Sequence, residues 1–135
     1  FERNGEFGGL GSPDPWPRAA SDAMLKYAAA PGGNTTLCVV ATDARLTQVQ
    51  CKRMAMMAAA GMARAIVPVF TPFDGDIVFA LSTGRKEPRE PALALALIGT
   101  VAANCLARAI ARGVFEASGA LPDGTRSYRA IFETR

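Results

Sequence analysis

Two short stretches of the chain are apolar at almost every position, and two longer stretches repeat apolar residues at helical spacing. The short ones, "TTLCVVAT" (35–42) and "IVFALSTG" (77–84), are rich in β-branched and apolar side chains, a pattern that is typical of strands covered on both faces. The long ones span 46–68 and 91–113 and are rich in Ala, Leu and Met. The order strand, helix, strand, helix predicts a layered α/β sandwich.

Capping and breaking residues mark the ends of the first predicted helix. Thr47 followed by Gln50 is a capping-box pattern, so we expect the helix to begin there, and Pro68 ends it. Gly61 inside a helix costs about 1 kcal/mol relative to alanine, which predicts a close packing contact at that position. One face has apolar residues at roughly helical spacing and is expected to lie in the core; it consists of Val49, Met54, Met57, Ala58, Met62 and Ala65.

Glycine and proline set the other predicted boundaries. Gly84 is expected to end the second strand. Pro91 is well placed as the first residue of the long helix, and Gly113 as its C-terminal cap. Residues 19–30 can form a short helix after a loop rich in glycine and proline, and residues 126–135 are expected to form a last strand.

Composition narrows the class of protein. The chain has 135 residues, half of them hydrophobic, which suits one domain with a core of its own. The net charge of +3 is mild and the arginines are scattered, so we expect no nucleic-acid binding. The most apolar stretch, 91–107, is shorter than the roughly 20 residues of a membrane span, so we expect a buried helix and no membrane. The chain begins at Phe1, which indicates a processed product or a part of something larger.

The chain has three cysteines and no histidine. Cys38, Cys51 and Cys105 form no CxxC pair, so we expect buried reduced thiols in a cytoplasmic protein. The absence of histidine disfavours a mixed metal site, and we expect neither a metal nor a cofactor. It also excludes, within this chain, any Ser-His-Asp or Cys-His arrangement, so a nucleophile here needs another base.

The stretch "GGNTT" contains a residue that can supply its own base. A threonine at a chain terminus has an α-amine with a pKa of about 7.7–8.0, which can accept the proton of its hydroxyl. Thr35 has such an amine only if the bond after Asn34 is cut, and Gly32 and Gly33 give the backbone the freedom for an N-to-O acyl shift there. From spacing alone, a plain turn before a strand is the favoured interpretation, and cleavage is the alternative.

The motif "DGD" stands at the loop that enters the second strand. Asp74 and Asp76 flank Gly75. Such a motif is common in solvated turns and sometimes binds divalent cations. Beside an N-terminal threonine, the same carboxylates can hydrogen-bond the amine and the hydroxyl and hold them in a reactive geometry.

Taken in order, "GGNTTLCVVATDARLTQVQCKRMA" and "GMARAIVPVFTPFDGDIVFALSTG" resemble the autocleaved part of the DmpA family. This family comprises L-aminopeptidase/D-amidase-esterase enzymes, β-aminopeptidases and nylon-oligomer hydrolases. The resemblance is densest from Gly32 to Gly84, continues to about residue 117, and does not extend past Leu121. The "NTT" version is most similar to the nylon-oligomer hydrolase branch.

The resemblance implies a four-layer α-β-β-α sandwich of the DmpA, N-terminal-nucleophile-like type, of which this chain supplies part. It implies that 1–34 is the tail of the larger α subunit, that 35–135 is the β subunit, and that α/β units form a homo-oligomer. Carried over by residue, Asn34 and Thr35 flank the autocleavage site, Thr35 is the nucleophile, and Asp74 and Asp76 orient and activate it. The family also uses a lysine and an asparagine of the α part. Lys26 and Asn4 have the right residue types but no matching motif, so neither is assigned a role.

The resemblance therefore predicts an amide or peptide hydrolase with a small peptide or amide substrate, completed by the missing α part. Two alternatives stay open. One is acyl transfer to an amine, as in ornithine acetyltransferases, which share the autocleavage. The other is a non-catalytic binding domain in which the glycine-rich turn is never cut.

Overall fold

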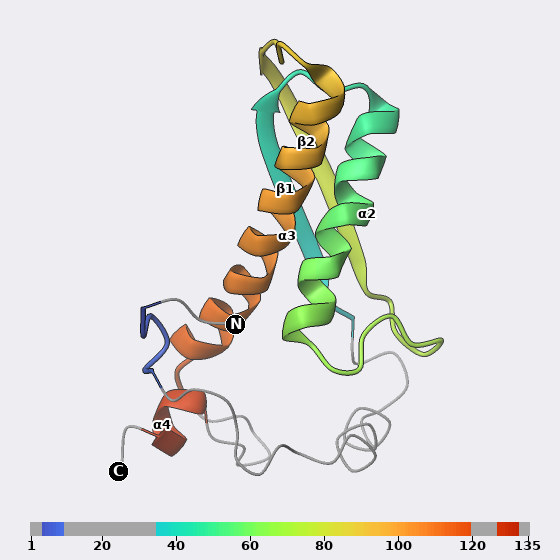
Figure 1. Cartoon of the computed structure of the whole chain (residues 1–135). Helices are drawn as coiled ribbons and strands as arrows, with labels where there is room; N and C mark the ends of the chain where they lie inside the picture. The colour runs from blue at the N-terminus through green and yellow to red at the C-terminus, as the bar shows by residue number, and fades with distance from the viewer. Residues whose placement is uncertain (1–3, 10–34, 120–126, 133–135) are drawn as a thin grey trace.

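The computed structural model of the chain describes residues 4–9, 35–119 and 127–132 (Figure 1). The elements follow in the order strand, helix, strand, helix and a short final helix, so the α/β prediction is confirmed. They are β1 (Leu37–Ala44), α2 (Gln48–Ala65), β2 (Ile77–Lys86), α3 (Pro91–Glu116) and α4 (Tyr128–Phe132).

The two strands form a parallel sheet in a single register over most of their length. Leu37 of β1 lies opposite Ile77 of β2, and the pairing continues to Thr42 opposite Ser82. The register then shifts by two residues between Thr42 and Ala44, so that Ala44 lies opposite Lys86. Gly84 has a positive φ of 66° within this irregular region, so it bends the strand without ending it. The prediction that β2 stops at Gly84 is wrong.

Helix α2 begins and packs as its sequence predicts. The Thr47 hydroxyl accepts a hydrogen bond from the Gln50 N–H, and the Gln50 side chain accepts one from the Thr47 N–H, which completes the capping box. Gly61 is buried against the backbone of Ala103 in α3, and its missing side chain lets the two helices approach closely. The predicted contact at Gly61 is confirmed.

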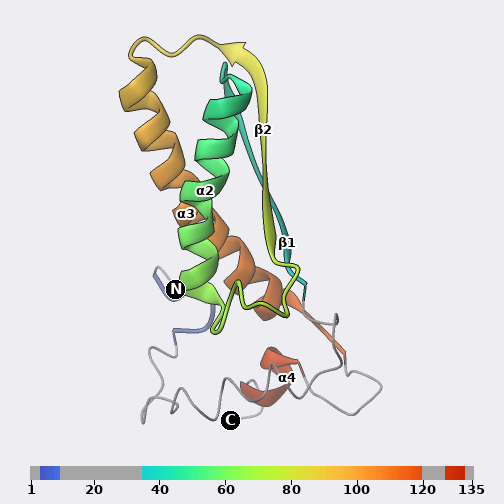
Figure 2. The ribbon, with the colours of Figure 1, turned by 90° about the vertical axis from the view of Figure 1, so that its right-hand side faces the viewer.

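Both long helices cover the same face of the sheet (Figure 2). The side chains between sheet and helices form the core, in which Met54 and Met62 of α2 are fully buried. The predicted apolar face is wrong at one position, because Val49 is exposed. The core consists of Cys38, Val40, Met54, Ala58, Met62 and Leu106.

The opposite face of the sheet is apolar and uncovered in the part of the chain that the structure describes (Figure 2). Leu37 and Val39 of β1 are 68% and 66% exposed, and Phe79 of β2 is 51% exposed. The expectation that the strands are covered on both faces is therefore not met by these residues. Because burial of an apolar side chain stabilises a protein by about 1.5–3 kcal/mol, this face is suited to contact with further protein.

The C-terminal part of the chain departs from the prediction. Helix α3 begins at Pro91 as expected, but it runs through Gly113 and ends at Glu116. Residues 128–132 are helical where a strand was predicted. The helix expected at 19–30 lies outside the described residues.

Helix α3 is long and apolar enough to cross a membrane, by length and composition only. Core helices of soluble proteins meet the same criterion. Here α3 packs against α2, and Gly99 lies directly against the side chain of Met57. The amino-terminal segment 4–9 is fixed to α3 by Glu6, whose two carboxylate oxygens accept hydrogen bonds from Arg108 at 2.9 and 2.6 Å.

Candidate functional site

The parallel register brings Thr35 and the "DGD" loop together just before the two strands begin. Leu37 pairs with Ile77, and the Ile77 N–H donates to the Thr36 carbonyl at 3.0 Å. Extended backward by two residues, this register sets Thr35 opposite Gly75. A Cβ atom built on Gly75 would lie only 2.5 Å from Thr35 Oγ1. The hydroxyl of Thr35 therefore lies against the backbone between the two aspartates.

Asp76 connects the start of β1 to the loop before β2. Its Oδ1 accepts a hydrogen bond from the Thr36 N–H at 2.8 Å, and its Oδ2 accepts one from the Phe70 N–H at 3.1 Å. Phe70 has a positive φ of 56°, a conformation that costs energy in a bulky residue, and the Asp76 carboxylate helps to hold it. Asp76 thus fixes the residue that directly follows Thr35.

Asp74 closes the turn on the other side of Gly75. Its Oδ2 accepts hydrogen bonds from the backbone N–H and the hydroxyl of Thr71, at 2.9 and 2.7 Å. The Asp74 N–H in turn donates to the Thr71 carbonyl at 3.0 Å. These three bonds make a rigid turn of residues 71–74 and fix the backbone on which Gly75 and Asp76 stand.

The thiol of Cys38 lies close enough to the site for the charge of Asp76 to affect its pKa. Burial raises the pKa of Cys38 above its usual value, and the negative charge of Asp76 raises it further. Cys38 is buried under the helices, so its thiol is protonated and belongs to the core. Within residues 4–9, 35–119 and 127–132, no group of three or more metal-binding side chains is assembled.

Comparison with known proteins identifies the family. The model of peptidase family S58 matches residues 12–126, which is most of the chain. The chain belongs to peptidase family S58, the DmpA family. It is 40% identical over 132 residues to an "uncharacterized aminopeptidase" of Mycobacterium tuberculosis and to one of Mycobacterium bovis. A similar protein of Mycobacterium leprae is 41% identical over 109 residues.

The alignment covers 86% of this chain but only 38% of the M. tuberculosis and M. bovis proteins. For the M. leprae protein the figures are 73% and 30%. The chain therefore spans well under half the length of the DmpA-family relatives that it matches.

The structure brings together three of the four site residues expected from the sequence. Thr35 lies against Gly75, the residue between Asp74 and Asp76. The Asp76 carboxylate accepts a hydrogen bond from the N–H of the residue after Thr35. Asn34 and Lys26 lie outside the described residues. Asn4 lies in the turn of the 4–9 segment, which contacts the C-terminal half of α3 through Glu6.

Sequence reasoning missed two contributors, Gly75 and Thr71. Gly75 has a φ outside the left-handed region, so its backbone does not demand glycine. What demands it is the space that the Thr35 hydroxyl occupies. The sequence signal was the glycine between two aspartates, but only the register shows which side chain fills the position. The role of Thr71 follows from "TPFD", in which a hydroxyl and a carboxylate three residues apart close a turn.

Proposed function

We propose that this chain contains the nucleophile of an autocleaved amide or peptide hydrolase, an aminopeptidase or oligoamide hydrolase, and that Thr35 is that nucleophile. In this proposal the precursor is cut between Asn34 and Thr35. Residues 1–34 are then the tail of a larger α subunit, and 35–135 form the β subunit. Asp74 and Asp76 orient and activate the new terminus.

The position of the Thr35 hydroxyl against Gly75 is the single observation that supports this proposal most strongly. The register of β1 and β2 places this hydroxyl beside the glycine that separates the two carboxylate residues. The next residue is tied to the Asp76 carboxylate through its N–H. Membership of a peptidase family supports the same reading, since it favours hydrolysis of an amide.

In this chemistry the terminal residue supplies both the nucleophile and the base. After cleavage the Thr35 amine accepts the proton of the Thr35 hydroxyl, which attacks the carbonyl carbon of the substrate. The C–N bond breaks, the amine returns the proton to the leaving nitrogen, and an ester to Thr35 remains. The amine then activates a water that hydrolyses the ester. In other hydrolases, oxyanion stabilisation contributes roughly 3–4 kcal/mol to such a step.

The rest of the site is proposed to come from the missing α part. The exposed apolar face of the sheet supports this, because a second sheet laid on it would give the four-layer α-β-β-α sandwich. The substrate is a small peptide or amide. Assembly of such α/β units into a homo-oligomer, in the cytoplasm, completes the proposal.

Intact-mass measurement of the full-length precursor tests the cleavage. The expected cut falls between Asn34 and Thr35 and leaves a fragment that begins with Thr35. Thr35→Ala is expected to abolish both the cut and turnover, because it removes the hydroxyl. Thr35→Ser is expected to retain some of each. Full processing and activity in Thr35→Ala would eliminate Thr35 as the nucleophile.

Two further readouts separate the alternatives. A single uncut species without amide-hydrolysing activity would favour a non-catalytic binding domain with an intact turn. Addition of an acceptor amine to a cleaved preparation distinguishes hydrolysis from acyl transfer, since a transferase makes a new amide and a hydrolase releases the free acid. Peptidase-family membership favours the free acid.

A further inference from the structure

The loop that joins α2 to β2 presents large apolar side chains at the end of the sheet where β1 begins (Figure 2). It spans residues 66–76 and ends in the two aspartates that flank Gly75. Within it, Val67, Phe70 and Phe73 are 74%, 46% and 70% exposed. Loops that lie beside a reactive residue and present apolar side chains are frequent sites of substrate contact.

Phe70 is fixed relative to Thr35 through one hydrogen-bonded group. The carboxylate of Asp76 accepts hydrogen bonds from the Thr36 N–H at 2.8 Å and from the Phe70 N–H at 3.1 Å. The two backbone nitrogens are therefore separated only by one carboxylate and a hydrogen bond on each side. Because the Thr36 nitrogen is bonded to the carbonyl carbon of Thr35, the backbone of Phe70 lies beside the residue that carries the proposed nucleophile.

The backbone of Phe70 has a conformation that bulky residues avoid. Its φ of 56° lies in the left-handed region, where the Cβ of an L-residue is crowded. Such conformations persist where surrounding bonds enforce them, and they are found most often at active and ligand-binding sites. The Phe70 ring is half-exposed and does not belong to the core. In the part of the chain that the structure describes, core packing therefore does not explain an aromatic side chain at this position.

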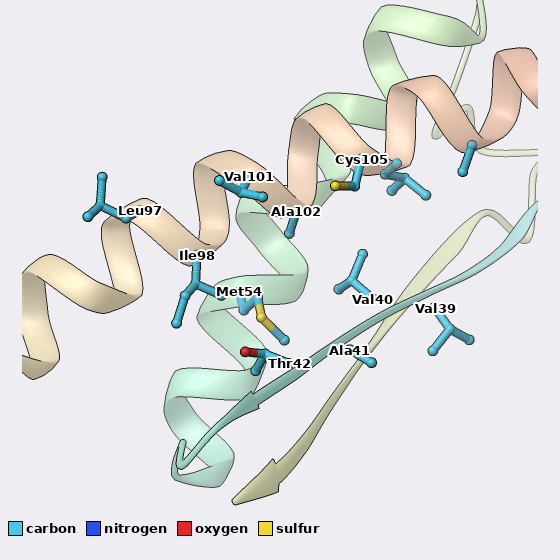
Figure 3. Close-up of a pocket in the computed structure, with 12 residues that line it drawn as sticks. Val39, Val40, Ala41, Thr42, Met54, Leu97, Ile98, Val101, Ala102 and Cys105 are labelled. Carbon is cyan, nitrogen blue, oxygen red and sulfur yellow. The ribbon is translucent and has the colours of Figure 1, made fainter. Parts of the chain in front are cut away.

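The cavities beside β1 lie in a different direction. One, of about 410 Å³, is enclosed by α3 and the middle of β1, from Val39 to Thr42 (Figure 3). Val39 is four residues beyond Thr35, which in an extended chain corresponds to roughly 13 Å. This cavity is therefore too far away for a group bonded to the carbonyl that Thr35 attacks. A second cavity, of about 640 Å³, extends from Thr36 along α3. Phe70 lines neither of the two.

We propose that Phe70 is a specificity-determining residue that contacts an apolar side chain on the acyl part of the substrate. This inference rests on the proposed function, since it takes Thr35 as the nucleophile. In that reaction the acyl part stays bonded to Thr35 Oγ1 until the ester is hydrolysed, whereas the amine leaves after the first step. A contact fixed beside Thr35 is used in both steps when it is made with the acyl part. The substrate class is then a small peptide or amide whose first residue is apolar.

Hydrolysis of leucinamide and glycinamide by the full-length, processed protein tests this contact. The two amides release the same leaving group, ammonia, and differ only in an isobutyl group. We expect the wild type to favour leucinamide in kcat/KM by at least about tenfold, which is typical of an apolar contact with a few carbon atoms. Phe70→Gly is expected to lose this preference, while its kcat/KM for glycinamide stays within about twofold of the wild type.

The choice of variants separates a contact with substrate from a role in folding. Glycine adopts a positive φ without strain, so Phe70→Gly should keep the melting temperature of the wild type. The loss should appear in KM with little change in kcat, because the contact is present in the ground state and the transition state alike. Phe70→Leu should restore the preference for leucinamide. A lower melting temperature with an unchanged preference in Phe70→Gly would overturn the proposal.

Val114→Ala is the matched control. Val114 is an apolar side chain of similar exposure, 55%, and it lines the second cavity. We expect this variant to keep the preference for leucinamide. A preference lost in Val114→Ala and kept in Phe70→Gly would place the acyl part in that cavity and overturn the proposal. Glycine isobutylamide, compared with glycinamide, has the isobutyl group on the leaving amine. An effect of Phe70→Gly on that pair alone would overturn the assignment to the acyl part.

Binding without turnover separates this proposal from the proposed function. Leucinol and ethanolamine each have an amine and a hydroxyl but no amide bond, and they differ by the same isobutyl group. In calorimetry on the full-length protein, leucinol is expected to bind at least about tenfold more tightly than ethanolamine in the wild type and in Phe70→Leu, and equally in Phe70→Gly. This pattern in a protein that hydrolyses no amide would contradict the proposed function and support the contact at Phe70. Amide turnover with no preference for the isobutyl group would overturn the contact alone.

Discussion

Substitution of Gly75 by alanine tests the geometry on which the proposed nucleophile depends. The φ of Gly75 lies outside the left-handed region, so alanine can adopt the backbone without strain. The added methyl carbon would lie 2.5 Å from Thr35 Oγ1 and 3.2 Å from Thr35 Cγ2. Non-bonded atoms are at their optimum separation at about 3.5–4.0 Å. The Thr35 side chain must therefore move by roughly 1 Å, or the loop must move by the same amount.

A displacement of about 1 Å strongly affects the rate of a reaction at the displaced atom but has little effect on the stability of the protein. A misplacement of about 1 Å can lower a catalytic rate about a hundredfold, which corresponds to ~2.7 kcal/mol of barrier. The same change restricts the unfolded chain, which by itself stabilises a protein by about 0.4–1 kcal/mol at a compatible position. We therefore expect a melting temperature within a few degrees of the wild type and a self-cleavage rate about a hundredfold lower.

The assay is the time course of cleavage by intact mass, followed by turnover of an amide substrate. Gly113→Ala is the matched control, because a Cβ there meets open space and alanine suits a helix. It should process and turn over like the wild type. Wild-type rates in Gly75→Ala, in a protein that melts normally, would refute the reasoning, since the Thr35 hydroxyl would then not need the space beside Gly75.

Three further outcomes follow from the structure. Asp76→Ala leaves the Thr36 N–H and the Phe70 N–H without their acceptor, so urea unfolding should show a free energy of unfolding lower by about 1–3 kcal/mol, together with lost activity. Asp76→Asn should recover more of the stability than of the activity. Gly61→Ala drives a methyl group into the backbone of Ala103, and calorimetry should show a destabilisation of about 1–3 kcal/mol or more; an unchanged melting temperature would contradict the packing. Because the folded pKa of Cys38 is raised, its contribution to stability is present below its unfolded pKa of 9.0 and is lost as pH rises through the folded value; urea titrations across this range should show the decline, and Cys38→Ala should reduce it.

The elements that were predicted correctly are those with local signals. The Thr47 capping box, the proline at the start of α3 and the close contact at Gly61 each follow from the chemistry of one or two residues. The errors fall where tertiary contacts decide the outcome. Gly113 continues a helix whose preceding turn contacts Glu6 through Arg108 and Arg112. Gly84 lies within a strand because the register shift accommodates its positive φ.

The final helix shows the same limit. Tyr128 lies near Phe115 of α3, with ring centroids 6.2 Å apart, and Arg129 lies over the Phe115 ring at 5.3 Å. These contacts favour a helical turn in a segment whose β-branched and aromatic residues suggested a strand. The cysteines were only partly predicted for a related reason. Cys38 is buried as expected, but Cys105 is exposed because the face of α3 on which it lies has no neighbour in the described chain.

The site also depends on a long-range feature that motif reading does not contain, the parallel register of β1 and β2. "NTT" and "DGD" are each common, and their separation in sequence says nothing about their distance in space. The pairing of Leu37 with Ile77 sets Thr35 beside Gly75 at the amino ends of both strands.

In open parallel sheets, ligands usually bind beyond the carboxyl ends of the strands. A nucleophile that must also be a chain terminus cannot follow that rule if its chain goes directly into a strand, because the terminus then lies at the amino end. In the proposed function, the carboxylates that orient it precede the neighbouring strand by one residue (Asp76) and three residues (Asp74). A register slip of one residue would move Asp76 away from the Thr36 N–H.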